Sequence, residues 1–221
     1  AKDVRDKGAL GTSYVNHMDR QGLPRYQWTA CEGRTRLRFL AYSHNLNRTN
    51  GFAFMIMTTM WLRAFGIENR IAFQTDWGQE FGGNNPDTVH KLSRQFLRPL
   101  NAELRRYPKG RKQYNGRVER SHRTDDEEFY RPYLLQAANP DHFLALSQRW
   151  LYFYNVLRPH YGDGMMRKPP LENLYRLGYD GQSMLGLMPP ILLDPISSDL
   201  LLDCEPPPGN DLLATYIPVF L

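Results

Sequence analysis

The stretch RTRLRFLAYSH, residues 34–44, alternates basic and apolar side chains, and this alternation constrains the fold more than any other feature. In an extended strand, Arg34, Arg36 and Arg38 would point to one side, and Thr35, Leu37 and Phe39 to the other. The preceding segment, residues 25–32, also has a strand pattern, and Gly33 supplies a turn between the two. We therefore expect a half-buried antiparallel hairpin.

The other segments alternate between helical and extended patterns. Helices are predicted at 9–24, 49–66, 85–100, 117–135, 139–157 and 168–181, and short strands at 69–76 and 102–108. Strands near the start, with helices enough to cover both faces, predict an α/β fold with a mixed central sheet.

The length of 221 residues allows one large domain with an extension. We expect a compact core at residues 1–180. Residues 181–221 contain seven prolines, five acids and no Lys or Arg, so they are expected to form an extended acidic arm. A strand in ILLD or TYIPVFL is an option within that arm.

Composition excludes several classes of protein. The longest apolar run, residues 52–62, has 11 residues, whereas a membrane-spanning helix needs about 20. Cys31 and Cys204 are far apart and neither belongs to a CxxC motif, so both are expected to be reduced and structural. These features predict a soluble, cytoplasmic protein with no membrane partner. We also expect no small-molecule substrate.

The charge is concentrated in one region. The whole chain carries +5, but residues 94–123 contain ten Lys or Arg and only two acids, Glu103 and Glu119. A local excess of this size suits a polyanion such as DNA. An ordinary solvated basic face is the alternative, and composition alone does not separate the two.

Two acidic residues, Asp76 and Glu119, are candidates for a catalytic or metal-binding role. Asp76 follows a predicted strand and precedes WGQEFGG, and the carboxyl end of a strand in an open α/β sheet borders the usual ligand crevice. Glu119 is a single acid between Arg117 and Arg120 on a predicted helix. The alternatives are a turn or capping role for Asp76, and a surface ion pair with Arg120 or Arg123 for Glu119.

Two carboxylates that converge would repel by roughly 4 kcal/mol at 4 Å and an effective dielectric near 20, and a divalent cation would reverse that sign. Oxygen ligands without a His or Cys cluster select Mg²⁺ or Mn²⁺. Two such ions inside a basic surface are what phosphodiester chemistry requires. The four acids at residues 125–128 are expected to form a solvated helix face instead, and Glu80 is a weaker candidate for a supporting role.

Four segments in this order resemble the integrase catalytic core of insertion-sequence transposases, relatives of retroviral integrases. They are YQWTACEGRTRLRFLA, QTDWGQEFGG, YNGRVERSHRTDDEEFY and WLYFYNVLRPHYGDGMMRKPPLENL, and they cover most of residues 25–178. The resemblance implies an RNase H-like fold and a DDE active site. It also implies Mg²⁺- or Mn²⁺-dependent DNA cleavage and strand transfer with two ions, action as a homo-oligomer, and association with the nucleoid.

The resemblance assigns roles to individual residues. Asp76 in TDWGQEF matches the second Asp, and Glu119 in NGRVERSHR matches the Glu, at a separation of 43 residues. Asp3 is taken as the first Asp; Asp19, or an Asp preceding Ala1, are alternatives. The residues expected to bind DNA are Lys109, Arg111, Lys112, Asn115, Arg117, Arg120 and Arg123.

Two other functions stay open at this point. The chain could be a catalytically inactive DNA-binding remnant of a transposase, or an RNase H-like nuclease that hydrolyses but does not join strands. The first predicts salt-dependent binding without reaction, and the second predicts hydrolysis products alone.

Overall fold

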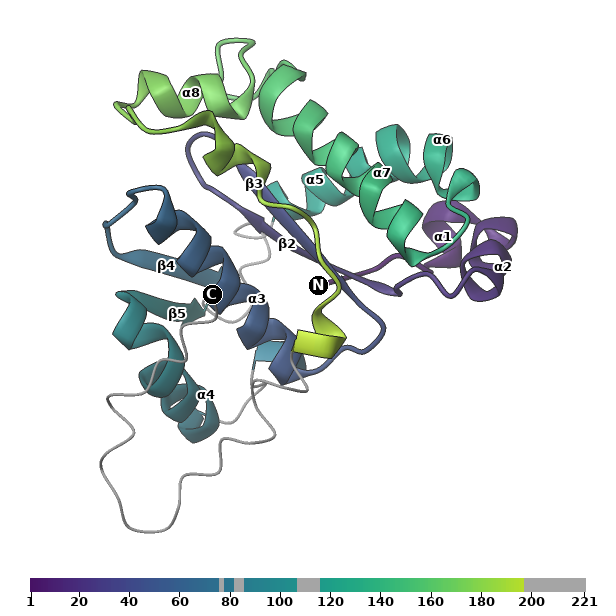
Figure 1. Cartoon of the computed structure of the whole chain (residues 1–221), viewed down its shortest axis with the longest axis horizontal. Coiled ribbons are helices and arrows are strands. Elements are labelled where there is room, and N and C mark those ends of the chain that lie inside the picture. The colour runs from purple at the N-terminus through teal and green to yellow at the C-terminus, as the bar shows by residue number, and fades with distance from the viewer. Residues whose placement is uncertain (76–77, 82–85, 107–115, 197–221) are drawn as a thin grey trace.

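The computed structural model describes residues 1–75, 78–81, 86–106 and 116–196 (Figure 1). Its first sheet has three antiparallel strands in the order β1 (Lys2–Asp3), β2 (Tyr26–Cys31) and β3 (Arg38–Ser43). Cys31 lies opposite Arg38, and Tyr26 lies opposite Ser43. The hairpin predicted from the alternating sequence is therefore confirmed.

A second sheet is formed by β4 (Ile71–Thr75) and β5 (Ala102–Arg106), which are parallel. The segment between them forms α4 (Pro86–Leu92), a π-helical turn (Ser93–Leu97) and a 3₁₀ turn (Arg98–Leu100). The α/β class is confirmed, but within the described residues the strands form two small sheets, not the single mixed sheet that we expected.

Helices cover both faces of the first sheet. On one face lies α3 (Arg48–Ala64). On the other lie α5 (Gly116–Asp125), which continues through a π-helical turn (Asp126–Tyr130) into α6 (Arg131–Tyr133), and α7 (Pro140–Tyr152), which ends in a second such turn (Phe153–Leu157). The short helices α1 (Lys7–Leu10) and α2 (Thr12–Arg20) lie at one end of the molecule and α8 (Pro170–Arg176) at the other (Figure 1).

The strand β3 is buried on both faces, and this corrects the half-buried strand that we expected. Leu40 and Tyr42 belong to the core beneath α7, whereas Phe39 and Ala41 belong to the core against α3. Arg38 lies on the first of these faces and is 0% exposed. The alternation was predicted correctly, but the arginine side is covered because the helices α5 and α7 form a second layer there.

The C-terminal part of the described chain returns along β3. Leu192 forms a parallel bridge with Tyr42, and the Asp194 carboxylate accepts hydrogen bonds from the backbone N–H groups of His44 (2.7 Å) and Asn45 (3.2 Å). The extended arm predicted for residues 181–221 is thus docked on the sheet at ILLD, while residues 197–221 lie outside the described residues. In the described part of the chain, no helix has the length and apolar character needed to cross a bilayer.

Candidate catalytic and nucleic-acid-binding site

The helix α5 carries Glu119 and runs antiparallel to β2. Near its start, an Arg117 guanidinium nitrogen donates to the Gly33 carbonyl; further along, His122 Nε2 lies 3.2 Å from Thr29 Oγ1. At its end, Gln27 Nε2 donates to Asp125 Oδ2 at 2.7 Å. These three contacts place Glu119 beside the Thr29–Gly33 end of β2 and its turn.

A buried polar network holds α5 in this position. The Asp125 carboxylate, which is 0% exposed, accepts hydrogen bonds from Arg38 Nη2, Trp150 Nε1 and Gln27 Nε2, each at 2.7 Å. The Tyr130 hydroxyl donates to Gln27 Oε1. One carboxylate therefore joins α5 to β2, β3 and α7, because each of the three donors comes from a different element.

The solvated face expected for the acidic run at residues 125–128 is wrong for Asp125 and Asp126, whose side chains are 0% and 15% exposed, whereas Glu127 and Glu128 are 47% and 37% exposed. Each of its four members is ion-paired: Asp125 with Arg38, Asp126 with Lys2, Glu127 with Arg123, and Glu128 with Arg158. The sequence offered no sign of this, since three of the four partners are distant along the chain. Through Asp125, Asp126 and Glu128, the run joins the end of α5 and the π-helical turn after it to β3, to β1 and to the chain after α7.

Glu119 differs from all of these acids. Its side chain is exposed, and among the described residues it takes part in no ion pair or hydrogen bond. Arg123, the basic residue one turn later that was a candidate partner, is paired with Glu127 at 2.9 Å. Of the two arginines considered as surface partners of Glu119, Arg123 is therefore already paired with another acid. The Glu119 carboxylate is exposed to solvent.

Asp3 is not brought to Glu119. Its carboxylate accepts from Arg25 Nη2 at 2.8 Å and from the Arg5 backbone N–H at 2.9 Å, and it lies opposite Tyr26 in the β1–β2 ladder. Tyr26 precedes Thr29 by three residues, about 10 Å along a strand, and Glu119 lies beyond Thr29. The hydrogen bond from Arg25 to Asp3 also raises the pKa of that arginine.

The alternative first acid, Asp19, lies on α2 and forms an ion pair with Arg5 at 2.6 Å. It therefore sits in the helical pair next to β1. The role of Asp3 as a catalytic acid stays a prediction, with the described geometry unfavourable to it.

Asp76 itself lies outside the described residues, but the chain on either side of it is described. The strand β4 ends at Thr75, and the 3₁₀ turn Gln79–Phe81 follows. That turn packs on α3 at Gly51, where an added Cβ would lie 2.5 Å from the Glu80 carbonyl oxygen. Phe81 meets Trp28 edge to face, with ring centroids 6.1 Å apart. The segment that follows Asp76 is thereby held beside β2.

The amino group of Ala1 reaches the same turn. It lies 3.4 Å from Glu80 Oε1, so the start of β1 and the turn after β4 meet there. Lys2 then donates to the His122 carbonyl oxygen at 3.2 Å and pairs with Asp126. Burial lowers the pKa of His122 to about 3, which leaves its ring neutral at pH 7. Glu80 was considered as a supporting group, and its described partner is the Ala1 amino group.

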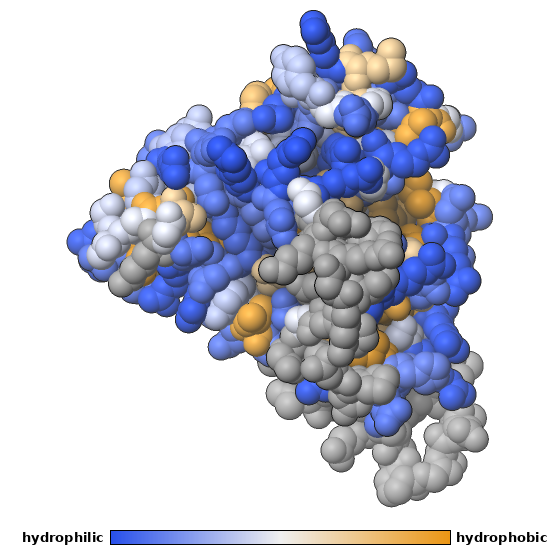
Figure 2. Space-filling view, turned by 180° about the vertical axis from the view of Figure 1, so that it is seen from behind, coloured by the Kyte–Doolittle hydropathy of each residue, from blue (hydrophilic) through white to orange (hydrophobic). Residues whose placement is uncertain are grey.

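The predicted DNA-binding residues divide into two groups. Lys109, Arg111, Lys112 and Asn115 lie outside the described residues. Arg117, Arg120 and Arg123 are exposed on α5 at intervals of three residues. The side of the molecule opposite to the view of Figure 1 has a largely hydrophilic surface in its upper part (Figure 2). An exposed basic stripe on a firmly anchored helix can contact a phosphate backbone.

Among the residues that the structure describes, no group of three or more His, Cys, Asp and Glu side chains is arranged to hold a metal ion. Asp76 is outside those residues, so the predicted pair of Asp76 and Glu119 stays a prediction. Glu119 itself has the properties of a hard-cation ligand: a carboxylate oxygen, exposure, and no cation paired with it among the described residues.

No protein-family model matches the chain, and a search of curated proteins found no relative. The geometry described above is therefore the basis for any proposal about function.

Proposed function

We propose that this chain is the catalytic core of a DDE-type DNA transposase or integrase, with an RNase H-like fold. The observation that carries the proposal is the contrast between Glu119 and the acids that follow it on the same helix. Four of those acids are neutralised by basic partners, whereas Glu119 is exposed, unpaired among the described residues, and set within a basic stripe.

The order of the elements supports the RNase H-like fold. Three antiparallel strands come first, with α1 and α2 between β1 and β2; a long helix follows, and then a strand that pairs in parallel with the next. A later helix carrying the acid packs against β2. The proposal joins the two sheets through pairing of β1 with β4, and the meeting of Ala1 with Glu80 is compatible with that pairing.

In the proposed site, Asp76 and Glu119 hold Mg²⁺ or Mn²⁺, with a third carboxylate for which Asp3 is one candidate. The bound ions would supply charge neutralisation for an attack on a phosphodiester. The residues of this chain have separate roles. Asp125 and Arg38 orient α5, while Arg117, Arg120 and Arg123, with Lys109, Arg111, Lys112 and Asn115, would bind the DNA backbone. Two DNA ends acted on together would require a homo-oligomer.

The test is a DNA nicking and joining assay on the full chain, with supercoiled plasmid, a labelled oligonucleotide, and Mg²⁺ or Mn²⁺. Asp76→Asn and Glu119→Gln should each lower nicking by more than about 100-fold, because even outer partners of a metal ligand cost about 10–100-fold. Glu127→Gln is the matched control, since it removes an exposed acid from the same helix. Nicking by Glu119→Gln at the rate of Glu127→Gln would refute the proposal.

A non-catalytic DNA-binding remnant is the second candidate. The engagement of Asp3 with Arg25 favours it, because Asp3 lies at the far end of β2 from Glu119. It predicts binding whose log K falls with log salt at a slope near −5 for about six phosphate contacts, and no nicking by the parent protein. A nuclease would instead nick the plasmid and never join the labelled strand to it.

A further inference from the structure

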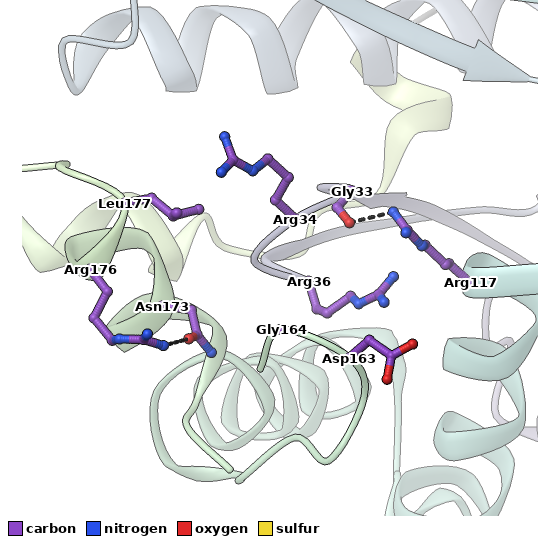
Figure 3. Close-up of a pocket in the computed structure, with 9 residues that line it drawn as sticks. All are labelled: Gly33, Arg34, Arg36, Arg117, Asp163, Gly164, Asn173, Arg176 and Leu177. Atoms are coloured by element: carbon purple, nitrogen blue, oxygen red, sulfur yellow. Dashed lines mark hydrogen bonds between the residues drawn. The ribbon is translucent and has the colours of Figure 1, made fainter. Parts of the chain in front are cut away.

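A basic cavity lies at the turn between β2 and β3, outside the residues assigned above to catalysis. It has a volume of about 460 Å³. The turn supplies Gly33, Arg34 and Arg36, and the loop before α8 supplies Asp163 and Gly164. Asn173, Arg176 and Leu177 come from α8 and its end, and Arg117 comes from the first turn of α5 (Figure 3). Three segments distant in sequence thus build one cavity.

The cavity is strongly electropositive. It is lined by four arginines and one acid, and none of the four arginines forms an ion pair with a described carboxylate. Two of the guanidinium groups donate to neutral oxygens: Arg117 to the Gly33 carbonyl, and Arg176 Nη1 to Asn173 Oδ1 at 2.8 Å (Figure 3). The Glu32 carboxylate accepts from the backbone N–H of Arg34 at 2.9 Å. Four like charges around one space repel one another, and an anion placed there would reverse the interaction.

Arg36 shows the strongest sign of a missing ligand. Its Nη1 is buried and has no hydrogen-bond partner among the described residues. Its backbone has φ of +66°, in the left-handed region that a non-glycine residue rarely adopts. Strained residues and unsatisfied buried donors both concentrate at functional sites. The backbone is held in this conformation by the turn itself, in which the Arg36 N–H donates to the Glu32 carbonyl at 3.1 Å and the Glu32 N–H donates to the Leu37 carbonyl at 2.7 Å. An oxyanion in the cavity would compensate the positive charge of the guanidinium.

The lining distinguishes among anions. Among its described residues there is no aromatic side chain on which a base could stack, and Leu177 is its one large apolar residue. Arg34, Arg117 and Arg176 are exposed, so the site is open on its rim. Guanidinium groups bind phosphate oxygens in a bidentate manner. These features fit a phosphate within a continuous strand better than a free nucleotide.

We propose that this cavity binds a backbone phosphate of DNA and forms a second anchor point beside the Glu119 site. The identification of the strand as DNA rests on the proposed function; the anion site itself does not. Arg117 and Glu119 are two residues apart on α5 and therefore face different directions. A strand held by Arg36 and Arg117 would pass beside the helix that carries Glu119, and its phosphate would set the position of the strand relative to that carboxylate.

Binding of labelled duplex and single-stranded oligonucleotides, measured by fluorescence anisotropy across a salt series, tests the proposal. The key variant is Arg36→Gly, which removes the guanidinium and suits the positive φ. Affinity should fall roughly tenfold, as for one lost charge-assisted hydrogen bond. The salt slope should become shallower by about 0.9 for duplex or about 0.7 for single strands. The thermal midpoint should stay equal or rise, which separates lost binding from unfolding.

Arg20→Gln is the matched control, because Arg20 is an exposed arginine at the α2 end, remote from α8 (Figure 1). The double variant Arg34→Gln/Arg176→Gln should behave as Arg36→Gly does. Equal affinities and slopes for Arg36→Gly and Arg20→Gln would overturn the proposal. Arg36-dependent binding of a mononucleotide, with DNA binding unaffected, would overturn the assignment to DNA.

The outcome is independent of the nicking assay. Loss of DNA affinity in Arg36→Gly, together with no nicking by the parent protein, would retain the phosphate site and reject the enzyme. Nicking that depends on Glu119, together with parent-like binding by Arg36→Gly, would retain the enzyme and reject this site.

Discussion

The substitution Asp125→Asn tests whether the buried network is what holds α5 on the sheet. The Arg38–Asp125 pair is 0% exposed on both sides, and the carboxylate serves three donors at 2.7 Å. Asparagine has nearly the same shape as aspartate but lacks the negative charge. Its NH₂ group would also face one of the three hydrogen-bond donors, and two donors cannot bond to each other. Arg38 would be left as a buried charge without a counter-ion.

The expected loss of stability in Asp125→Asn follows from the burial of this ion pair. Removing one partner of a buried ion pair typically destabilises a protein by about 3–5 kcal/mol, a large fraction of a total of about 5–15 kcal/mol. For a chain of this size the thermal midpoint should fall by roughly 6–20 °C. Glu127→Gln, which breaks an exposed pair on the same helix, should cost less than about 1 kcal/mol.

The assay is urea unfolding followed by tryptophan fluorescence, since Trp150 donates directly to Asp125. A double-mutant cycle with Arg38→Met measures the coupling, which should exceed about 2 kcal/mol because the two residues are in direct contact. A loss below about 1 kcal/mol in Asp125→Asn, or additive effects in the cycle, would refute the role assigned to this network.

Two further predictions concern stability. Burial lowers the pKa of His122 to about 3 from the ordinary 6.5, so below pH 6.5 the unfolded chain binds a proton that the folded chain does not. The contribution of a neutral His122 to the free energy of unfolding should therefore be fully present above pH 6.5 and should fall below that pH by up to about 1.4 kcal/mol per pH unit. In urea titrations at pH 7.5, 6.0 and 5.0, His122→Asn should reduce this dependence on pH. Equal pH dependence in the variant and the parent would contradict the prediction. Gly51→Ala should destabilise by about 1–3 kcal/mol, because its methyl group would meet the Glu80 carbonyl oxygen at 2.5 Å and Trp28 Cζ3 at 3.2 Å. Helix propensity alone predicts a gain of about 0.8–1 kcal/mol, so stabilisation in the same unfolding assay would show that the turn does not pack there.

Local structure was largely readable from neighbouring residues. The alternation at residues 34–44 predicted the hairpin, and Asn139-Pro140 predicted the start of α7, where the Asn139 side chain accepts from the His142 N–H at 2.8 Å. Such features depend on side chains within a few positions of one another, so the sequence contains all the information that they need. The isolation of Glu119 within basic residues was readable in the same way.

The sequence did not show which charged side chains are buried in ion pairs and which are exposed. Arg34, Arg36 and Arg38 occupy equivalent places in the alternating pattern, yet Arg38 is buried against Asp125 while Arg34 and Arg36 line a cavity. The difference arises because α5 and α7 bury Arg38 beside Asp125, whereas the turn that carries Arg34 and Arg36 meets the first turn of α5 at Arg117 and borders the cavity. Asp125 and Glu119 are likewise acids on one helix. Asp125 lies on the side that faces β2 and therefore has a structural role, whereas Glu119 is exposed.

The sequence by itself therefore determined the α/β class, the hairpin, most helix positions and the acids worth testing, because these follow from periodicity and local chemistry. The tertiary structure alone decided which charges are neutralised, that Asp3 pairs with Arg25 at the far end of β2 from Glu119, and that four arginines surround one cavity. Those outcomes depend on which distant segments the packing brings within a few ångströms, where desolvation and charge pairing act.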